Sequence, residues 1–223
     1  MHLPKVEPVT VAIAGSAARF PVRRIFCVGQ NYADHVREMG GDPTRPAPFF
    51  LTTPADAVVA SGAVLAFPSQ TADLHHEVEL VIALGRGGTN VAVADAPALV
   101  FGHAVGIDLT RRDLQAAAKQ AGRPWDMAKG FDQSAPLGAL SPGLPPAGGA
   151  ITLSVNGEQR QAGDLGQMIW NVAEIIAVLS TYVTLAGGDL IFTGTPAGVG
   201  PIRAGERVRA EIAGLEALEV GFV

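Results

Sequence analysis

Glu77 and Glu79 stand two residues apart in segment 77–84, whose run of apolar residues predicts a buried strand. Side chains alternate across the two faces of a strand, so both carboxylates point to the same side. Two neighbouring negative charges on a half-buried strand repel each other, and a divalent cation between them removes that repulsion. The spacing by itself favours a metal site and a solvated strand face about equally.

Asp108 supplies a third carboxylate, because it ends an apolar strand predicted over 99–107 and directly precedes a predicted helix. Three oxygen ligands suit Mg²⁺ or Mn²⁺ better than zinc. The alternative is an ordinary acidic residue at the entry to a helix. His75 shares the predicted face of the two glutamates, but we expect it to support the site or the core. His103 is likewise expected to be a core residue.

Arg112 and Gln115 lie three residues apart, and hence on one face, in a helix predicted to end at Gln120. Thr110 and Asp113 form a T-x-x-D pattern that predicts a capping box at its start. The guanidinium of Arg112 offers a planar fork of donors, and Gln115 adds an amide, so together they suit an anionic substrate. Taken alone, Arg112 is more typical of a surface ion pair with a neighbouring aspartate.

His35 and Glu38 are three residues apart in a short helix predicted over 31–39. A carboxylate beside a histidine fixes its tautomer and prepares it as a general base, although a surface pair is the commoner outcome of this spacing. Lys129 follows in a weakly charged stretch. Its ammonium group would neutralise a developing enolate, although loop lysines are usually solvated.

Thr195 lies in a glycine-rich turn, 193–200, that follows a predicted strand. The backbone N–H groups of such a turn, together with the threonine hydroxyl, suit a substrate carboxylate or an oxyanion. The turn has neither the lysine of a phosphate-binding loop nor the strand-to-helix context of a dinucleotide fingerprint. Nucleotide binding is therefore excluded.

Composition places these groups in a globular protein. The 223 residues include 16 basic and 21 acidic side chains, a net charge of −5, and 48% hydrophobic residues, which predicts one domain and excludes disorder. The acidic balance argues against nucleic acid or an anionic membrane as partner. The single cysteine, Cys27, forms no internal disulfide and is expected in a buried strand. With no recognisable membrane span or signal peptide, a cytoplasmic location is expected.

Short strands separated by turns dominate the chain, which predicts a β-rich α+β fold. Besides those already described, a helix is predicted from Asn171, with Glu174 as its capping-box partner. Further strands are predicted over 9–13, 24–28, 190–193, 208–212 and 218–223.

Taken in order along the chain, these motifs resemble those of the fumarylacetoacetate hydrolase family, particularly its short single-domain members. The similarity runs from about Pro21 to Val223. It is carried by segments 28–35, 54–57, 76–80, 108–115, 129–132, 155–157 and 193–196. Several independent motifs in register are far more specific than any one of them.

The resemblance implies a mixed β-roll with a few peripheral helices, which forms a homodimer. It implies one catalytic domain over 21–223, preceded by a short N-terminal extension or strand over 1–20. It also assigns roles to the candidate residues. Mg²⁺ or Mn²⁺ is bound by Glu77, Glu79 and Asp108; His35 and Glu38 activate water from a mobile lid; Lys129, Arg112, Gln115 and Thr195 contact the substrate.

The reactions that the resemblance implies act on 2-oxo acids. Segments 40–43 and 48–58 are similar to those of family members that hydrolyse fumarylpyruvate to fumarate and pyruvate in bacterial gentisate breakdown, so this C–C cleavage is the predicted activity. The alternatives are an oxaloacetate decarboxylase or a 2-oxo acid tautomerase on the same metal site, and a non-catalytic metal-stabilised domain with no pocket. Relatives commonly carry lysine in place of Thr53, and arginine is frequent in place of Gln30, so the acyl group remains open.

Overall fold

The computed structural model describes residues 3–45 and 47–223, and most of its regular structure is strand. The largest sheet is mixed and has the order β4-β3-β15-β8-β9-β11-β5, with β12 paired to β9. Its strands are β3 (Arg24–Gly29), β4 (Phe49–Thr53), β5 (Val58–Ala60), β8 (Val78–Leu84), β9 (Val100–Ile107), β11 (Ala135–Leu137), β12 (Ser141–Pro142) and β15 (Asp189–Phe192).

A second sheet has the order β14-β13-β17-β18-β6, and two small sheets complete the strands. The second sheet consists of β6 (Val64–Leu65), β13 (Ala150–Val155), β14 (Glu158–Asp164), β17 (Arg207–Ile212) and β18 (Leu218–Phe222). The small sheets are the hairpin of β1 (Thr10–Ala12) with β2 (Arg19–Pro21), and β10 (Thr110–Arg111), β7 (Leu74–His76) and β16 (Gly200–Ile202).

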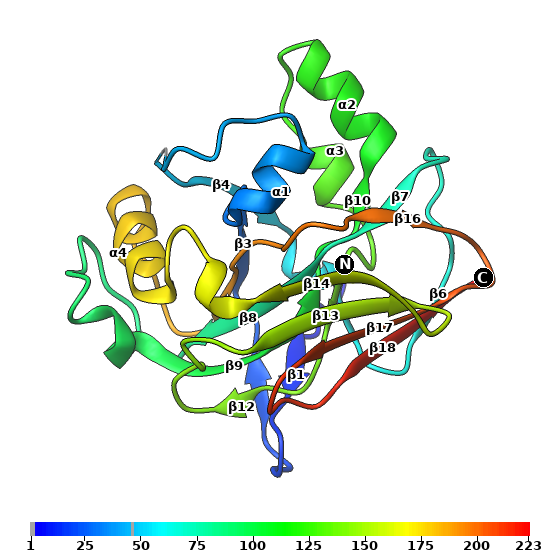
Figure 1. The fold of residues 1–223 in the computed structure, drawn as a ribbon. Coiled ribbons are helices and arrows are strands. Elements are labelled where there is room, and N and C mark those ends of the chain that lie inside the picture. Colours follow the sequence, from blue (N-terminus) through cyan, green and yellow to red (C-terminus); the bar gives the residue numbers. More distant parts are fainter. Residues whose placement is uncertain (1–2, 46) are drawn as a thin grey trace.

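Helices lie at the periphery of these sheets. In Figure 1, α1, α2 and α3 gather on one side of the molecule, and α4 lies apart from them. They span α1 (Ala33–Glu38), α2 (Arg112–Gln120), α3 (Asp126–Lys129) and α4 (Val172–Tyr182), with 3₁₀ turns η1 (Ala55–Ala57), η2 (Ala96–Leu99) and η3 (Leu165–Gln167). None of the helices in the described ranges is long and apolar enough to cross a membrane. The predicted β-rich α+β roll is confirmed.

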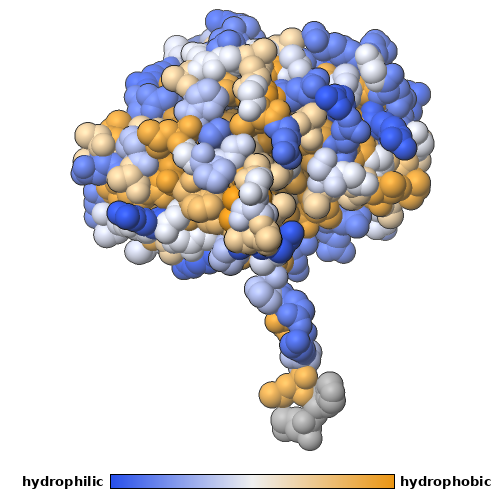
Figure 2. All heavy atoms as spheres, turned by 90° about the horizontal axis from the view of Figure 1, so that it is seen from below, coloured by the Kyte–Doolittle hydropathy of each residue, from blue (hydrophilic) through white to orange (hydrophobic). Residues whose placement is uncertain are grey.

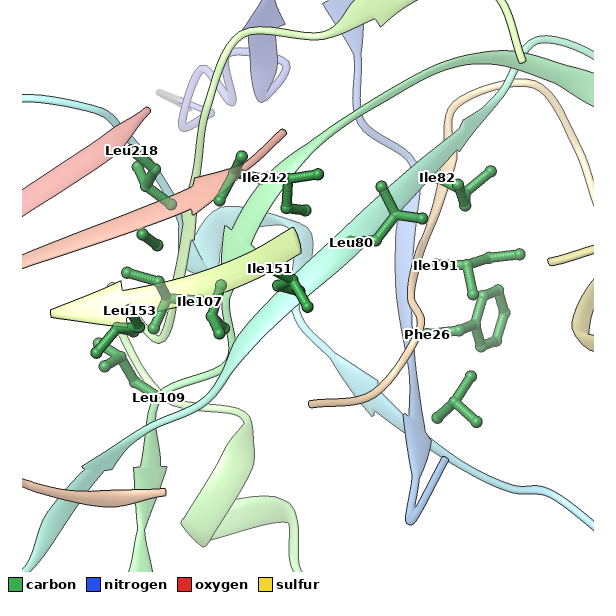
Figure 3. Close-up of a cluster of buried hydrophobic side chains, with 14 of the residues drawn as sticks. Phe26, Leu80, Ile82, Ile107, Leu109, Ile151, Leu153, Ile191, Ile212 and Leu218 are labelled. Carbon is green, nitrogen blue, oxygen red and sulfur yellow. The ribbon is translucent and has the colours of Figure 1, made fainter. Parts of the chain in front are cut away.

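The main core fills the space between the two large sheets. Leu80 and Ile107 from the first sheet belong to the same buried cluster as Ile151, Ile212 and Leu218 from the second, as Figure 3 shows. Burying such side chains is the dominant favourable term in folding. Strand β8 is buried along its whole length because the sheet is covered on both faces.

The opposite face of β8 places an acidic group beside an apolar cluster. Val81 and Ala83 on this face belong to a second buried cluster, which also contains Val11 and Phe20 of the N-terminal hairpin. Glu79 shares the face of Val81 by strand alternation and lies at the end of this row. Residues 3–8 precede the hairpin and are exposed, and this N-terminal segment extends from the body as an arm (Figure 2). The division into 1–20 and 21–223 stays a prediction.

Of the two capping boxes predicted at helix starts, the structure confirms one and contradicts the other. Asn171 accepts a hydrogen bond from the Glu174 N–H while the Glu174 side chain accepts from the Asn171 N–H, so the predicted capping box of α4 is confirmed. The box at Thr110 is wrong, because Thr110 belongs to β10 and α2 begins at Arg112 without a side-chain cap. Asp113 instead accepts from Ala72 N–H and the Thr71 hydroxyl at 2.9 and 2.6 Å, which ties α2 to the preceding loop.

Candidate active site

Three buried carboxylates converge where β8 and β9 meet. Glu77 and Glu79 flank the first residue of β8, and Asp108 directly follows β9, which is antiparallel to β8. This pairing brings the end of one strand beside the start of the other, and the Asp108 N–H donates to the Glu77 carbonyl at 2.9 Å. Oxygen atoms of all three carboxylates lie within 4.8 Å of one another. The metal site, rather than the solvated face, is the interpretation that this geometry favours.

Lys129 is buried between two of these carboxylates. Its Nζ donates to Glu77 at 2.8 Å and to Asp108 at 2.9 Å, and the residue is only 4% exposed. The alternative of a solvated loop lysine is therefore contradicted: the residue ends the short helix α3, which points it inward. Burial alone lowers the pKa of Lys129, but the charges of Asp108 and Glu77 outweigh burial and raise it.

The three carboxylates differ in how their charge is compensated. Burial raises the pKa of Glu77, but the charges of Lys129 and Arg112 outweigh it and lower the pKa to about 2. Burial and the charges of Asp108 and Glu77 raise the pKa of Glu79 well above its ordinary value. Burial also raises the pKa of Asp108, against the opposing effect of Lys129. Glu79 is thus the carboxylate whose charge the protein itself compensates least.

This donor set fits a hard divalent cation. When all three are ionised, the carboxylates carry three negative charges, whereas Lys129 and Arg112 supply two positive ones; within the described residues, Glu79 accepts a hydrogen bond from the Gly194 N–H alone, at 2.6 Å. Oxygen ligands of this kind bind Mg²⁺ or Mn²⁺, which also retain water in open positions. Glu77, Glu79 and Asp108 would hold the ion.

Arg112 joins the cluster from the first turn of α2. Its Nη2 donates to Glu77 at 2.5 Å and its Nη1 donates to the Gln115 side chain at 2.6 Å. The alternative of a surface pair between Arg112 and a neighbouring aspartate is therefore contradicted. His75 lies behind this guanidinium, with its Nδ1 at 3.4 Å from the Arg112 Nε and its Nε2 bonded to Asp73, so it supports the site without facing the metal ligands.

His35 and Glu38 form a hydrogen-bonded pair on α1. The His35 Nδ1 lies 3.1 Å from a Glu38 oxygen, the histidine is buried, and both oxygens of Glu38 accept from the Gly198 N–H, at 3.0 and 3.2 Å. The glutamate therefore engages Nδ1 and leaves Nε2 for the cavity. Asn31, just before α1, donates to the carbonyl of Thr193, which ties this segment to the turn that bears Gly198.

Thr195 is held by a glutamine that sequence reasoning missed. The Gln161 Nε2 donates to the Thr195 hydroxyl at 2.8 Å and to the Pro196 carbonyl at 2.9 Å, and its Oε1 accepts from Val78 N–H and faces His76 Nδ1. Gln161 is fully buried, although it lies in the otherwise polar strand β14. Because Gln161 fills an acceptor position of the hydroxyl, the Thr195 proton remains available to the cavity.

The turn 193–200 serves the site differently from the prediction. We expected its backbone N–H groups to bind a substrate carboxylate or oxyanion. Instead the N–H groups of Gly194 and Gly198 donate to Glu79 and Glu38. A Cβ at position 198 would lie 2.2 Å from the Arg160 carbonyl, and φ is +95° there, so glycine is required for this close approach. The turn positions protein carboxylates.

All nine candidate residues except Glu38 line one cavity of about 210 Å³. Glu38 reaches it through His35. The uncharged walls are formed by Cys27, Val28, Gly29, Gln30, Met39, Phe49, Leu51, Ala116 and Trp125. Among the described residues, a pocket beside the three carboxylates therefore exists, which contradicts the non-catalytic alternative. Cys27 is buried as expected, and burial raises its pKa well above the ordinary value, so it is no nucleophile.

Gln30 and Thr53, the two neutral residues at positions where relatives often carry a positive charge, lie differently with respect to this cavity. Gln30 lines it, and its φ of +58° is unusual for a residue other than glycine. Thr53 is buried in β4, where its hydroxyl lies 3.7 Å from the Cys27 sulfur. His103 is a core residue as expected, with its Nδ1 at 3.3 Å from the Gly143 carbonyl.

Comparison with known proteins places this site in a family. A sequence model described as the C-terminal region of fumarylacetoacetate hydrolase matches residues 24–223. The chain belongs to the fumarylacetoacetate hydrolase family. The predicted membership is confirmed, and the family match contains every candidate site residue.

Relatives within the fumarylacetoacetate hydrolase family carry more than one activity. A crystal structure of fumarylpyruvate hydrolase from Pseudomonas aeruginosa, in complex with Mn²⁺ and pyruvate, is 51% identical, covers 100% of this chain and 99% of that one, and gives a TM-score of 0.97. Fumarylpyruvate hydrolase of a Ralstonia species is 44% identical over 75% of this chain and 88% of its own length. The oxaloacetate tautomerase of Escherichia coli is 40% identical over 87% of this chain and 90% of its own.

Proposed function

We propose that this protein is a Mg²⁺- or Mn²⁺-dependent hydrolase that cleaves acylpyruvates, with fumarylpyruvate as substrate and fumarate and pyruvate as products. The observation that carries the proposal is the presence, on one cavity, of a carboxylate trio and a histidine whose other ring nitrogen is bonded to Glu38. The Mn²⁺ and pyruvate in the 51% identical Pseudomonas aeruginosa structure support both the metal and the product.

The metal ligands in this proposal are Glu77, Glu79 and Asp108. A divalent cation at these ligands supplies Lewis-acid polarisation of a 2-oxo acid. Arg112 and Lys129 keep the surrounding carboxylates paired, and both line the cavity, where their charge favours the carboxylate and enolate oxygens of a substrate. Gln115 and the Thr195 hydroxyl add neutral hydrogen-bonding groups on the same wall.

Water is activated by His35. Its Nε2 removes a proton from water while Glu38 stabilises the resulting imidazolium through Nδ1. The hydroxide adds to the C4 carbonyl of the acylpyruvate, the C3–C4 bond breaks, and its electron pair becomes the enolate of pyruvate. The imidazolium returns the proton to C3, and the new carboxylic acid ionises. One water is consumed, and fumarate and pyruvate are released.

A second candidate activity, tautomerisation of oxaloacetate, is favoured by the Escherichia coli relative. Tautomerisation passes through the enolate of oxaloacetate and decarboxylation through the enolate of pyruvate, and neither reaction needs added water. The choice of hydrolysis over these two reactions therefore depends on His35 and Glu38. The histidine is buried and hydrogen-bonded to the glutamate, an arrangement that suits the activation of water.

Incubation with Mg²⁺ and separate samples of fumarylpyruvate, acetylpyruvate and oxaloacetate tests the proposal. Release of pyruvate from the acylpyruvates without CO₂ is the expected result, and the variant His35→Asn should lose this activity while it still binds Mn²⁺ in calorimetry. Conversion of oxaloacetate alone would select the second activity instead.

Three further parts of the proposal concern the whole molecule. We infer that the segment bearing α1 acts as a lid, that the protein is a homodimer without nucleic-acid or membrane partners, and that it works in the cytoplasm on a product of aromatic ring cleavage. The anchoring of Asn31 and Glu38 on turn 193–200 gives the lid its closed contacts. Sedimentation equilibrium tests the dimer.

A further inference from the structure

One face of α2 forms a wall of the cavity that begins at the metal ligands and runs away from them. Arg112, Gln115, Ala116 and Lys119 all line the cavity, and their spacing of three, four and seven residues places them on one stripe of the helix. Arg112 lies at the metal ligands, as its bond to Glu77 shows. Lys119 therefore stands at the far end of the same wall.

Among the described residues that line this cavity, Lys119 is the one lysine or arginine that no carboxylate engages. Arg112 and Lys129 are both engaged by the buried carboxylates. Within the described ranges, Lys119 makes neither an ion pair nor a hydrogen bond through its ammonium group, and its side chain is exposed. The remaining lining residues away from the trio, such as Gln30 and Trp125, are uncharged. A second anionic group in the cavity would therefore find its positive partner at Lys119.

The distance along α2 matches a seven-carbon chain. Seven residues separate Arg112 from Lys119, which corresponds to about 10.5 Å along a helix. An extended seven-carbon chain spans about 7–8 Å between its terminal carbons, given carbon–carbon bonds near 1.5 Å. The long lysine side chain closes the remaining gap. A four-carbon diacid such as oxaloacetate, bound at the metal ligands, is too short to meet it.

The walls between these two ends suit a carbon chain rather than another charge. Phe49 and Trp125 pack edge to face with ring centroids 5.8 Å apart, and Leu51 and Met39 line the cavity with them. Apolar walls with a few polar groups at defined points are typical of small-molecule sites.

We propose that Lys119 binds the distal carboxylate of the substrate and so makes this enzyme prefer acylpyruvates that are diacids. The inference rests on the proposed function for the identity of the reacting end, and it adds the residue that reads the other end. Lys119 lies away from the reacting carbonyl, so it contributes equally to ground-state and transition-state binding. Its removal therefore raises KM and leaves kcat unchanged.

A binding experiment separates this inference from the reaction. 2-Oxoheptanedioate has seven carbons and two carboxylates but lacks the 4-oxo group needed for cleavage, and 2-oxoheptanoate differs from it only in lacking the distal carboxylate. Calorimetry with the Mn²⁺-loaded protein should show that Lys119→Met weakens the diacid about tenfold, which corresponds to the loss of one charge-assisted contact, and leaves the monoacid unchanged. Lys119→Arg should retain the preference.

Arg123→Met is the matched control, because Arg123 is an exposed cation just beyond α2 that does not line the cavity. It removes the same charge and should leave both affinities unchanged. In kinetics, Lys119→Met should raise KM for fumarylpyruvate and spare acetylpyruvate and oxaloacetate.

Equal weakening of both acids by Lys119→Met, or an equal loss of diacid affinity in Arg123→Met, would overturn the role of Lys119. If the wild type bound the diacid through Lys119 but hydrolysed no acylpyruvate, the proposed function would fail while this inference stood. The two failures are therefore distinguishable.

Discussion

Replacing Glu79 by glutamine should make the metal-free protein more stable while it removes metal binding. With all three carboxylates ionised, the cluster carries three negative charges and two positive ones, a net charge of −1, and Glu79→Gln brings it to zero. Glutamine has the same shape, and its oxygen still accepts from the Gly194 N–H.

The size of the gain follows from the geometry of the trio. Two unit charges 4.8 Å apart repel by about 3.5 kcal/mol at an effective dielectric constant near 20, and Glu79 lies within that distance of two carboxylates. The attraction of Lys129 offsets about one such repulsion, which leaves about 3.5 kcal/mol. Proton uptake sets a ceiling, because holding a carboxyl of ordinary pKa ~4.3 protonated at pH 7 costs about 3.7 kcal/mol.

The sign of the pH dependence follows from the raised pKa of Glu79. Between its unfolded and folded pKa values the folded state binds more protons, so the wild type loses stability as pH rises above the unfolded value. The advantage of Glu79→Gln should therefore be largest near neutral pH and disappear near pH 4.5.

Thermal unfolding in chelator is the measurement. A gain of about 3.5 kcal/mol raises Tm by about 7–14 °C in a protein of this size. Excess Mn²⁺ should stabilise the wild type and leave the variant unchanged. Glu216→Gln, at an exposed carboxylate outside the cluster, is the control and should stay within about 0.5 kcal/mol. A Glu79→Gln protein that is less stable than the wild type in chelator, or that Mn²⁺ stabilises equally, would refute the claim that Glu79 is repelled by the other two carboxylates and binds the metal.

Three further outcomes are expected. Lys129→Met removes the ammonium group that pairs with Asp108 and leaves Glu77 with Arg112, so it should cost about 3–5 kcal/mol by denaturant unfolding in chelator and abolish turnover; a cost below about 1 kcal/mol would contradict its role. Gly198→Ala forces a Cβ against the Arg160 carbonyl and displaces the N–H that holds Glu38, so kcat should fall about tenfold while Mn²⁺ affinity stays constant; a parallel loss of metal affinity would indicate general damage. Burial lowers the pKa of His103 in the folded protein. As the pH drops through the ordinary pKa of histidine, the unfolded state therefore takes up the proton before the folded state does, and the free energy of unfolding decreases. His103→Gln should flatten that fall between pH 7 and 5 in urea titrations, and an unchanged slope would exclude this histidine as its source.

The local features of the site were readable from the sequence. Strand alternation alone places Glu77 and Glu79 on one side, and the Asn171 box depends on atoms within one helical turn. Such features are fixed by neighbours a few residues away, and for that reason they survive into the folded protein. The predicted capping box at Thr110 is wrong because Thr110 pairs with His75 in the antiparallel β10–β7 ladder and is therefore a strand residue.

The partners of the site were decided by the tertiary structure. Gln161 is one of several polar residues in β14, and nothing in its local sequence sets it apart. Only the fold buries it against Val78 and Thr195, which are 83 and 34 residues away. Lys129 looked like a loop lysine until two carboxylates from different strands enclosed it. The chain itself determined which groups can bind a cation and move a proton. Which of them are charged, buried and paired was decided by strand order, because burial and charge pairing depend on contacts between segments far apart in the sequence.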